Sequence, residues 1–187
     1  MEAIEVGFNA VWRLDLSVFD DDRGHFFEVM SDKYSDLIPK LDFVPVQSNA
    51  SVSKKGALRG IHFSIVPGGQ AKWVTCLSGS ILDCVVDLRV NSPTFGESRL
   101  VELSAKSPQA IYIGPGMGHA FLSLEDGALV NYLLDSPYDP DQEFAVNAFD
   151  PTLSIGWPKM DYIQSIKDSE AVDLQQLISI GKLPKFH

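Results

Sequence analysis

Apolar and polar residues alternate in short runs along most of the chain. The alternation predicts strands at about 43–54, 57–64, 70–77, 81–90, 98–104, 109–113, 119–124 and 127–135. A period of two is typical of strands with one buried face. Turn-forming residues separate the runs, as at Pro67-Gly68-Gly69 and Glu125-Asp126-Gly127. Many short strands with regular turns predict an all-β sandwich or barrel.

The two ends of the chain are less regular. Residues 10–18 alternate well enough for a strand, residues 20–24 have the composition of a turn, and residues 25–30 resume as a short strand. Residues 31–38 predict one or two helical turns, and the chain beyond residue 139 is expected to be irregular except for a helix over 169–178. No repeat or linker interrupts this pattern, so we expect one domain over residues 1–187. His187 is expected to be disordered.

Composition and charge narrow the classes of partner. The chain is 45% hydrophobic and 21% charged, which is ordinary for a globular protein. Its formal net charge of −10 argues against nucleic acid or an anionic membrane as the main partner. We see no signal-peptide pattern and no membrane-spanning stretch, and we expect a cytoplasmic location. Cys76 and Cys84 could pair across strands, but two buried free thiols are favoured.

Positive and titratable side chains gather in one strand-like segment. Arg59, His62 and Lys72 lie within fourteen residues of each other. Strand alternation would allow His62 to share a face with Lys72 on the next strand. We therefore expect a β wall that binds an anionic ligand and supplies a base.

A metal site is the first chemical alternative for these residues. His62 has no second His two positions later, and His62 with His119 gives fewer than the usual three or four ligands. The sequence also carries no phosphate-binding loop or dinucleotide fingerprint. We therefore expect neither a metal nor a cofactor.

Proton transfer without a cofactor fits the candidate residues better. It needs a base whose pKa is near neutral and a carboxylate that orients this base. It also needs an acid on the opposite face of the substrate and a cation near the developing oxyanion. His62, an Asp, Tyr132 and Lys72 can fill these roles. Taken singly, each has a plainer interpretation, such as a packed His, a rim Tyr or a surface acid.

The chain also contains a set of short segments in a characteristic order over about residues 10–170. They are Asp22-Arg23-Gly24-His25-Phe26-Phe27-Glu28, Gln47-Ser48-Asn49, Leu58-Arg59-Gly60-Ile61-His62-Phe63, Gln70-Ala71-Lys72, Asp83-Cys84-Val85-Val86-Asp87-Leu88-Arg89, Ser92-Pro93-Thr94-Phe95-Gly96, Pro115-Gly116-Met117-Gly118-His119-Ala120-Phe121, Tyr132, Tyr138, Glu143, Asp150-Pro151, Ile155-Gly156-Trp157-Pro158 and Ser165-Ile166-Lys167-Asp168. Together they resemble the dTDP-4-dehydrorhamnose 3,5-epimerase family. The resemblance implies an all-β, cupin-like jelly roll with a few short helices, one of them near the C-terminus.

The resemblance also implies a role for each candidate. His62 would remove the proton next to the 4-keto group of a dTDP-linked 6-deoxyhexose, with Asp168 as its partner. Lys72 would stabilise the enolate, and Tyr132 would return a proton from the other face, without a cofactor. The substrate-binding residues would be Arg23, Glu28, Gln47, Asn49, Arg59, His119, Tyr138, Glu143 and Lys167. The family implies a homodimer that exchanges N-terminal strands, so that Arg23 and Glu28 could act across the interface.

This chain departs from the best-known family members in two places. Residues 117–121 read Met-Gly-His-Ala-Phe instead of Phe-Ala-His-Gly-Phe, and Leu133 follows Tyr132 where Lys is usual. These variants resemble the branch that serves antibiotic deoxysugar pathways, in which some members invert one carbon. Inversion at C3, at C5 or at both therefore stays open. A 3,4-ketoisomerase and a non-catalytic sugar-nucleotide binder are more distant alternatives.

Overall fold

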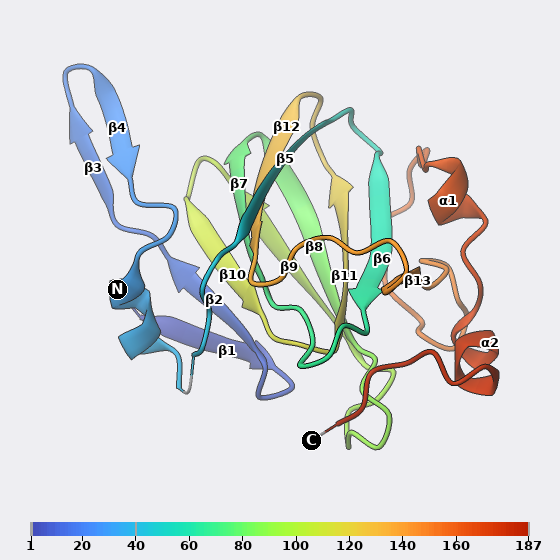
Figure 1. Ribbon diagram of the computed structural model, residues 1–187. Coiled ribbons are helices and arrows are strands. Elements are labelled where there is room, and N and C mark those ends of the chain that lie inside the picture. Colours follow the sequence, from blue (N-terminus) through green and yellow to red (C-terminus); the bar gives the residue numbers. More distant parts are fainter. Residues whose placement is uncertain (1, 40, 187) are drawn as a thin grey trace.

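The computed structural model describes residues 2–39 and 41–186, and its main body is a sandwich of two antiparallel sheets (Figure 1). The six-stranded sheet contains, in spatial order, β1 (Ala3–Gly7), β2 (Val11–Asp15), β10 (Gln109–Ile113), β7 (Lys72–Ser78), β12 (Ala128–Leu134) and β5 (Gln47–Ser53). The five-stranded sheet contains β13 (Glu143–Ala145), β6 (Leu58–Ser64), β11 (Met117–Ser123), β8 (Ser80–Asp87) and β9 (Ser98–Ser104). The predicted all-β sandwich is confirmed, whereas the expectation for His187 lies outside the described residues.

Every strand predicted between residues 43 and 135 is present, with its ends moved by a few residues. The ends of the chain differ more from the prediction. The run 10–18 divides into β2 and β3 (Val18–Asp21), and the predicted turn at 20–24 is the tip of a hairpin between β3 and β4 (Gly24–Phe27). Strands β1 and β13 were not predicted, because one is largely exposed and the other is three residues long and is held by pairing with β6.

The helical predictions were partly correct. Residues 31–38 contain a 3₁₀ helix, η1 (Asp32–Leu37). The helix expected over 169–178 is the shorter α2 (Leu174–Ser179), which buries Leu174 and Leu177. A further short helix, α1 (Ile166–Ser169), was not predicted and lies beside the five-stranded sheet (Figure 1). No helix in residues 2–39 and 41–186 has both the length and the apolar character needed to span a membrane.

Three apolar clusters hold the sandwich together. One lies between the sheets, a second packs the C-terminal segment on the outer face of the five-stranded sheet, and a third packs the segment after β4 on the outer face of the six-stranded sheet. In the third cluster Tyr34 stacks on Trp73, with 5.7 Å between the ring centroids. Cys76 belongs to the cluster between the sheets and Cys84 to the outer cluster of the five-stranded sheet, and both are buried and free, as predicted.

Candidate active site

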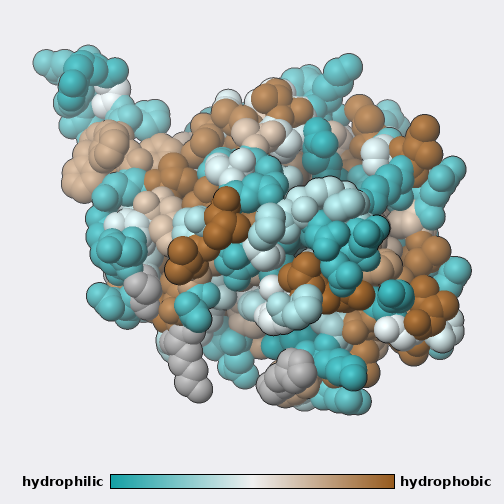
Figure 2. All heavy atoms as spheres, viewed as in Figure 1, coloured by the Kyte–Doolittle hydropathy of each residue, from teal (hydrophilic) through white to brown (hydrophobic). Residues whose placement is uncertain are grey.

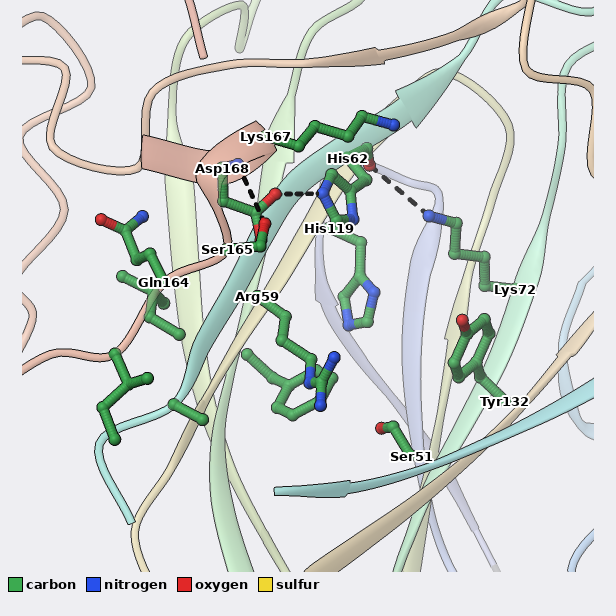
Figure 3. A pocket seen from close by; sticks show the side chains of 14 residues that line it. Ser51, Arg59, His62, Lys72, His119, Tyr132, Gln164, Ser165, Lys167 and Asp168 are labelled. Carbon is green, nitrogen blue, oxygen red and sulfur yellow. Dashed lines mark hydrogen bonds and ion pairs between the residues drawn. The ribbon is translucent and has the colours of Figure 1, made fainter. Parts of the chain in front are cut away.

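A pocket of about 360 Å³ opens between the two sheets beside α1 (Figure 3). Its walls come from β5, β6, β7, β11, β12 and the segment that leads into α1. The lining residues are Ser51, Ala57, Leu58, Arg59, His62, Lys72, His119, Phe121, Tyr132, Ile163, Gln164, Ser165, Lys167 and Asp168. Seven of the predicted site residues thus line the pocket, and two of them, Lys167 and Asp168, come from a helix that the sequence did not predict.

A bulge in β6 brings Arg59 and His62 to the same wall. In the pairing with β11, His62 lies opposite His119 and Arg59 lies opposite Phe121, so β6 carries one extra residue between them. The extra residue compensates for the odd spacing of Arg59 and His62, which would otherwise face opposite ways. Gly60 sits in the bulge at φ +105°, and a Cβ there would lie 2.5 Å from the carbonyl oxygen of His119. Only glycine fits this position.

Asp168 reaches His62 from α1. The N-cap residue Ser165 accepts a hydrogen bond from the backbone N–H of Asp168 at 3.1 Å, which fixes the first turn of the helix. His62 Nε2 then lies 2.6 Å from Asp168 Oδ1 (Figure 3). Burial alone would raise the pKa of Asp168, but the hydrogen bond and charge of His62 and hydrogen bonds from Ser165 and Gly60 lower it. The carboxylate therefore stays ionised and orients the imidazole, whose Nδ1 is left free.

Lys72 and Tyr132 come from the sheet that faces His62. The expectation that Lys72 shares a wall with His62 was wrong, because β6 and β7 belong to different sheets. The two side chains still meet across the sandwich, where Lys72 Nζ donates to the carbonyl oxygen of His62 at 3.5 Å. Burial lowers the pKa of Lys72, while Glu143 and Asp83 act to raise it. Burial raises the pKa of Tyr132, which keeps the phenol protonated near neutral pH.

His119 carries a second carboxylate that the sequence reasoning missed. His119 Nε2 lies 2.7 Å from Oδ2 of Asp83, a residue of β8 with 0% exposure. Asp83 was noted only as part of a family segment, not as a site residue. The available signal was a charged residue in an otherwise apolar strand, since lone buried carboxylates are costly. Ser51 and Gln164 also line the pocket and were not predicted.

Four of the remaining predicted residues lie near the pocket or its rim. Glu143 is half-buried, and the charges of Lys72, His62 and Lys167 oppose the rise that burial causes in its pKa. Gln47 donates to Asn49 Oδ1 at 3.0 Å and accepts from the backbone N–H of Tyr138 at 2.9 Å. These contacts place polar groups around the mouth, where a large ligand would emerge.

Arg23 and Glu28 are not brought to the pocket. Arg23 lies on the hairpin that projects from the body, its side chain is 90% exposed, and it pairs with Asp21 (Figure 1). Glu28 pairs with Lys33. Within one chain, neither residue contributes to this site.

Three of the four family departures lie on faces that point away from the pocket. Gly118 packs against Ile61 and Leu88, and Ala120 belongs to the outer cluster of the five-stranded sheet. Leu133 packs into the outer cluster of the six-stranded sheet. The fourth, Met117, belongs to the cluster between the sheets. None of the four lines the pocket, so they carry no direct information on which carbon is inverted.

The pocket thus joins a His–Asp pair, a facing phenol and several cations inside an all-β sandwich. In the described part of the chain, no group of three or more His, Cys, Asp or Glu residues is arranged to hold a metal ion. This is the arrangement of an acid–base enzyme that handles an anionic ligand.

Comparisons with known proteins agree with this class. The family model described as dTDP-4-dehydrorhamnose 3,5-epimerase matches residues 5–176. A dTDP-4-dehydrorhamnose 3,5-epimerase of Mycolicibacterium smegmatis is 42% identical over 185 residues, which cover 98% of this chain and 91% of the relative. The structure of the RmlC epimerase of Mycobacterium tuberculosis has a TM-score of 0.95 at 38% identity and covers 100% of this chain and 94% of that one.

A third similar structure is that of ChmJ, a 3'-monoepimerase from Streptomyces bikiniensis in complex with dTDP-quinovose. Its TM-score is 0.91 at 38% identity, with 99% of this chain and 93% of that chain covered. The chain belongs to the dTDP-4-dehydrorhamnose 3,5-epimerase family and is an isomerase with a cupin-like jelly-roll fold. The resemblance inferred from the sequence segments is confirmed.

Proposed function

We propose that this chain inverts C3, C5 or both of a dTDP-linked 4-keto-6-deoxyhexose in deoxysugar biosynthesis, without a cofactor. A ketone acidifies the C–H bonds on both of its sides. Removing one of these protons leaves an enolate, and returning a proton to the other face of the same carbon inverts it. The relatives named as 3,5-epimerases and the 3'-monoepimerase ChmJ support this reaction class.

His62 is the base in this proposal. The 2.6 Å contact between His62 Nε2 and Asp168 Oδ1 is the observation that carries the assignment. It leaves Nδ1 free to accept the proton, and the ionised Asp168 stabilises the imidazolium that forms. The C–H electron pair moves into the enolate, whose oxygen is stabilised by the buried ammonium of Lys72.

Tyr132 is the acid on the other face. It stands on β12 of the six-stranded sheet, whereas His62 stands on β6 of the five-stranded sheet. A sugar ring between the sheets therefore meets the base on one face and the phenol on the other (Figure 3). Tyr132 protonates the carbon. Solvent then reprotonates the phenolate, and the imidazolium of His62, whose side chain is partly exposed, releases its proton to solvent.

The diphosphate and the nucleotide are assigned to the remaining polar groups. Arg59, His119 and Lys167 line the pocket and supply positive charge or hydrogen-bond donors to the diphosphate. The exposed ring of Tyr138 stacks on thymine at the mouth. Gln47, Asn49 and Glu143 complete the polar rim.

The protein is proposed to act as a homodimer with exchanged N-terminal strands. Phe19 and Phe26 on the hairpin are 57% and 64% exposed, although a two-stranded hairpin that buries little is only marginally stable. Figure 2 shows these apolar surfaces on the hairpin below a hydrophilic tip. A second copy would cover them and would receive Arg23 and Glu28 in its own pocket. The chain is further proposed to form one domain and to work in the cytoplasm.

The His62→Ala variant tests the proposed base. Loss of a general base should lower turnover by roughly 10²- to 10⁴-fold, because the imidazole that accepts the proton is removed. Binding of dTDP, measured by calorimetry, should stay within about threefold of the unmodified protein, since the nucleotide contacts remain. Turnover at the original rate would remove His62 as the base, and a parallel loss of dTDP binding would indicate a damaged fold instead.

A further inference from the structure

Two histidines with carboxylate partners stand side by side in the pocket wall. His62 on β6 and His119 on β11 are direct cross-strand partners, and each uses Nε2 to contact a carboxylate. Asp168 contacts His62, and Asp83 contacts His119. Both histidines keep Nδ1 free of hydrogen bonds within the described residues. Because the chemical groups are the same, only their surroundings can give the two rings different tasks.

The carboxylate of Asp168 does not depend on His62 alone. Ser165 and the backbone of Gly60 act together with His62 to lower its pKa. These groups favour the ionised carboxylate whether the imidazole is neutral or charged. The side chain of His62 is also 34% exposed, so solvent can exchange its proton. His62 is therefore placed to exchange protons with solvent.

The carboxylate of Asp83 has fewer hydrogen-bond partners and a more apolar setting. Its Oδ2 contacts His119 at 2.7 Å, while its Oδ1 is buried and has no hydrogen-bond partner. Its neighbours along the same face of β8 are Ile81 and Val85, which belong to the apolar cluster between the sheets. The charge of Lys72 acts on Asp83 without a hydrogen bond, so among the described residues His119 is the group in direct contact with this carboxylate. A buried carboxylate is costly as an anion unless the group that contacts it is a cation.

We propose that Asp83 is a positioning residue that holds His119 as an imidazolium, with its Nδ1–H directed to a phosphate oxygen of the substrate's diphosphate. This rests on the proposed function, which supplies the diphosphate. The two His–Asp pairs then divide the work. The pair whose histidine is partly exposed moves protons, and the buried pair carries a fixed charge that helps to hold the substrate.

Other charged or titratable groups face His119 from each neighbouring element of the pocket. They are Arg59 and His62 on β6, Asp83 on β8, Lys72 on β7, Tyr132 on β12, and Lys167 and Asp168 on α1. Arg59 and Lys72 oppose a charge on His119. Among these groups, however, only Asp83 is hydrogen-bonded to the ring, and a bound diphosphate adds further negative charge.

Nitrogen NMR of the ¹⁵N-labelled protein tests the charge states without any mutation. At about pH 8, where a free imidazole is neutral, the His119 ring should give the two similar nitrogen shifts of an imidazolium, whereas the His62 ring should give the separated shifts of a neutral ring. Assignment uses the signals that disappear in His119→Gln and in His62→Ala. A neutral His119 ring at about pH 8 overturns the proposal.

The Asp83→Asn variant tests the consequence for binding. The probe is dTDP-glucose, whose diphosphate diester stays fully ionised and which lacks the keto group needed for turnover. At about pH 8 the variant should bind it roughly tenfold more weakly, because a charged donor is replaced by a neutral ring. At about pH 5.5 the ring protonates without help from Asp83, so affinity should return. Equal loss at both pH values would indicate a structural role and overturn the proposal.

Asp168→Asn is the matched control, because it removes the carboxylate of the other pair. Its affinity for dTDP-glucose should remain near that of the unmodified protein at both pH values, while turnover falls. If Asp83→Asn fails to fold, the NMR measurement decides alone. If the unmodified protein neither binds dTDP-glucose nor exchanges substrate protons, the proposed function fails. The nitrogen NMR spectrum still reports the charge of His119 in that case, so the two failures can be told apart.

Discussion

Tyr132 and His62 face the same pocket from opposite sheets, and the setting of each side chain decides which way its proton moves. Burial raises the pKa of Tyr132, so the phenol holds its proton until an enolate is near. The ring of His62 has one nitrogen fixed by Asp168 and one free. The proposed acid and the proposed base therefore face each other across the pocket.

Tyr132→Phe should separate proton removal from inversion. His62 can still remove a proton and return deuterium from solvent to the same face, so exchange into substrate should continue. Net inversion should fall by roughly 10²- to 10⁴-fold, because the opposite face has lost its acid. Proton NMR in D₂O reports both quantities in one sample. Tyr112→Phe is the control, since Tyr112 is buried in the outer cluster. Equal loss of exchange and inversion would contradict the assigned role.

The chemistry of single residues was more predictable than their partners. His62, Lys72 and Tyr132 were assigned from residue type and from family segments, and the structure brings all three to one pocket. Asp83 was missed because its role depends on the pairing of β8 with β11, which no local pattern records. Asp168 was recognised as the partner of His62 through its family segment, whereas Asp83 needed the sheet order.

Strand β6 and helix α1 bring together His62 and Asp168, the proposed catalytic pair. The bulge at Gly60 turns Arg59 and His62 to the same side, and the capped first turn of α1 aims Asp168 at His62. Strand alternation predicted the existence of β6 but not the bulge, because a single extra residue leaves the hydrophobic pattern almost unchanged. Helix α1 has four residues, too few for a helical period to be visible in the sequence.

Leu133→Lys should leave the choice of carbon unchanged. The side chain lies on the outer face of β12, packed in the cluster that covers the six-stranded sheet, while its neighbour Tyr132 faces the pocket. The ratio of deuterium incorporated at C3 and C5 should therefore match that of the unmodified protein. A changed ratio would mean that this face communicates with the pocket.

Asp87, at the end of β8, should make the free energy of unfolding depend on pH in the acidic range. Burial would raise its pKa, but hydrogen bonds from Arg89, Ser92 and Thr94 lower it to about 2. The unfolded chain protonates an Asp near pH ~4, so this carboxylate stabilises the fold above that pH, and the contribution is lost as the pH falls towards about 2.

The Asp87→Asn variant measures that contribution. It should lower the free energy of unfolding by on the order of 2 kcal/mol at neutral pH, and by less at about pH 3. Urea unfolding at the two pH values gives both numbers, with the exposed Asp36→Asn as control. A loss that is the same at both pH values would show that ionisation of Asp87 is not responsible.

At the scale of the whole molecule, one chain alone leaves the proposed site incomplete. The hairpin that carries Arg23 points away from the pocket of its own chain, and its aromatic residues are exposed. A dimer that exchanges N-terminal strands accounts for both features. The sequence suggested this assembly through its family segments only, because an interface between copies leaves no periodic signal of its own.

Mixing two inactive variants tests that assembly. Arg23→Ala leaves His62 intact, and His62→Ala leaves Arg23 intact, so a hybrid dimer contains one pocket with both residues if Arg23 crosses the interface. Random reassociation should restore about one quarter of the original activity, because about half of the dimers are hybrids with one complete pocket. Without reassociation each variant should stay inactive or weak. No recovery in mixed dimers would mean that Arg23 does not serve the partner's pocket.

In the proposed reaction the protein removes and returns protons beside a keto group. Proton NMR of dTDP-4-keto-6-deoxyglucose with the protein in D₂O tests it most directly. Deuterium should appear at C3, at C5 or at both, and both positions would identify a double epimerase, whereas one would identify a mono-epimerase. Binding of the sugar nucleotide with no deuterium at either carbon would contradict the account.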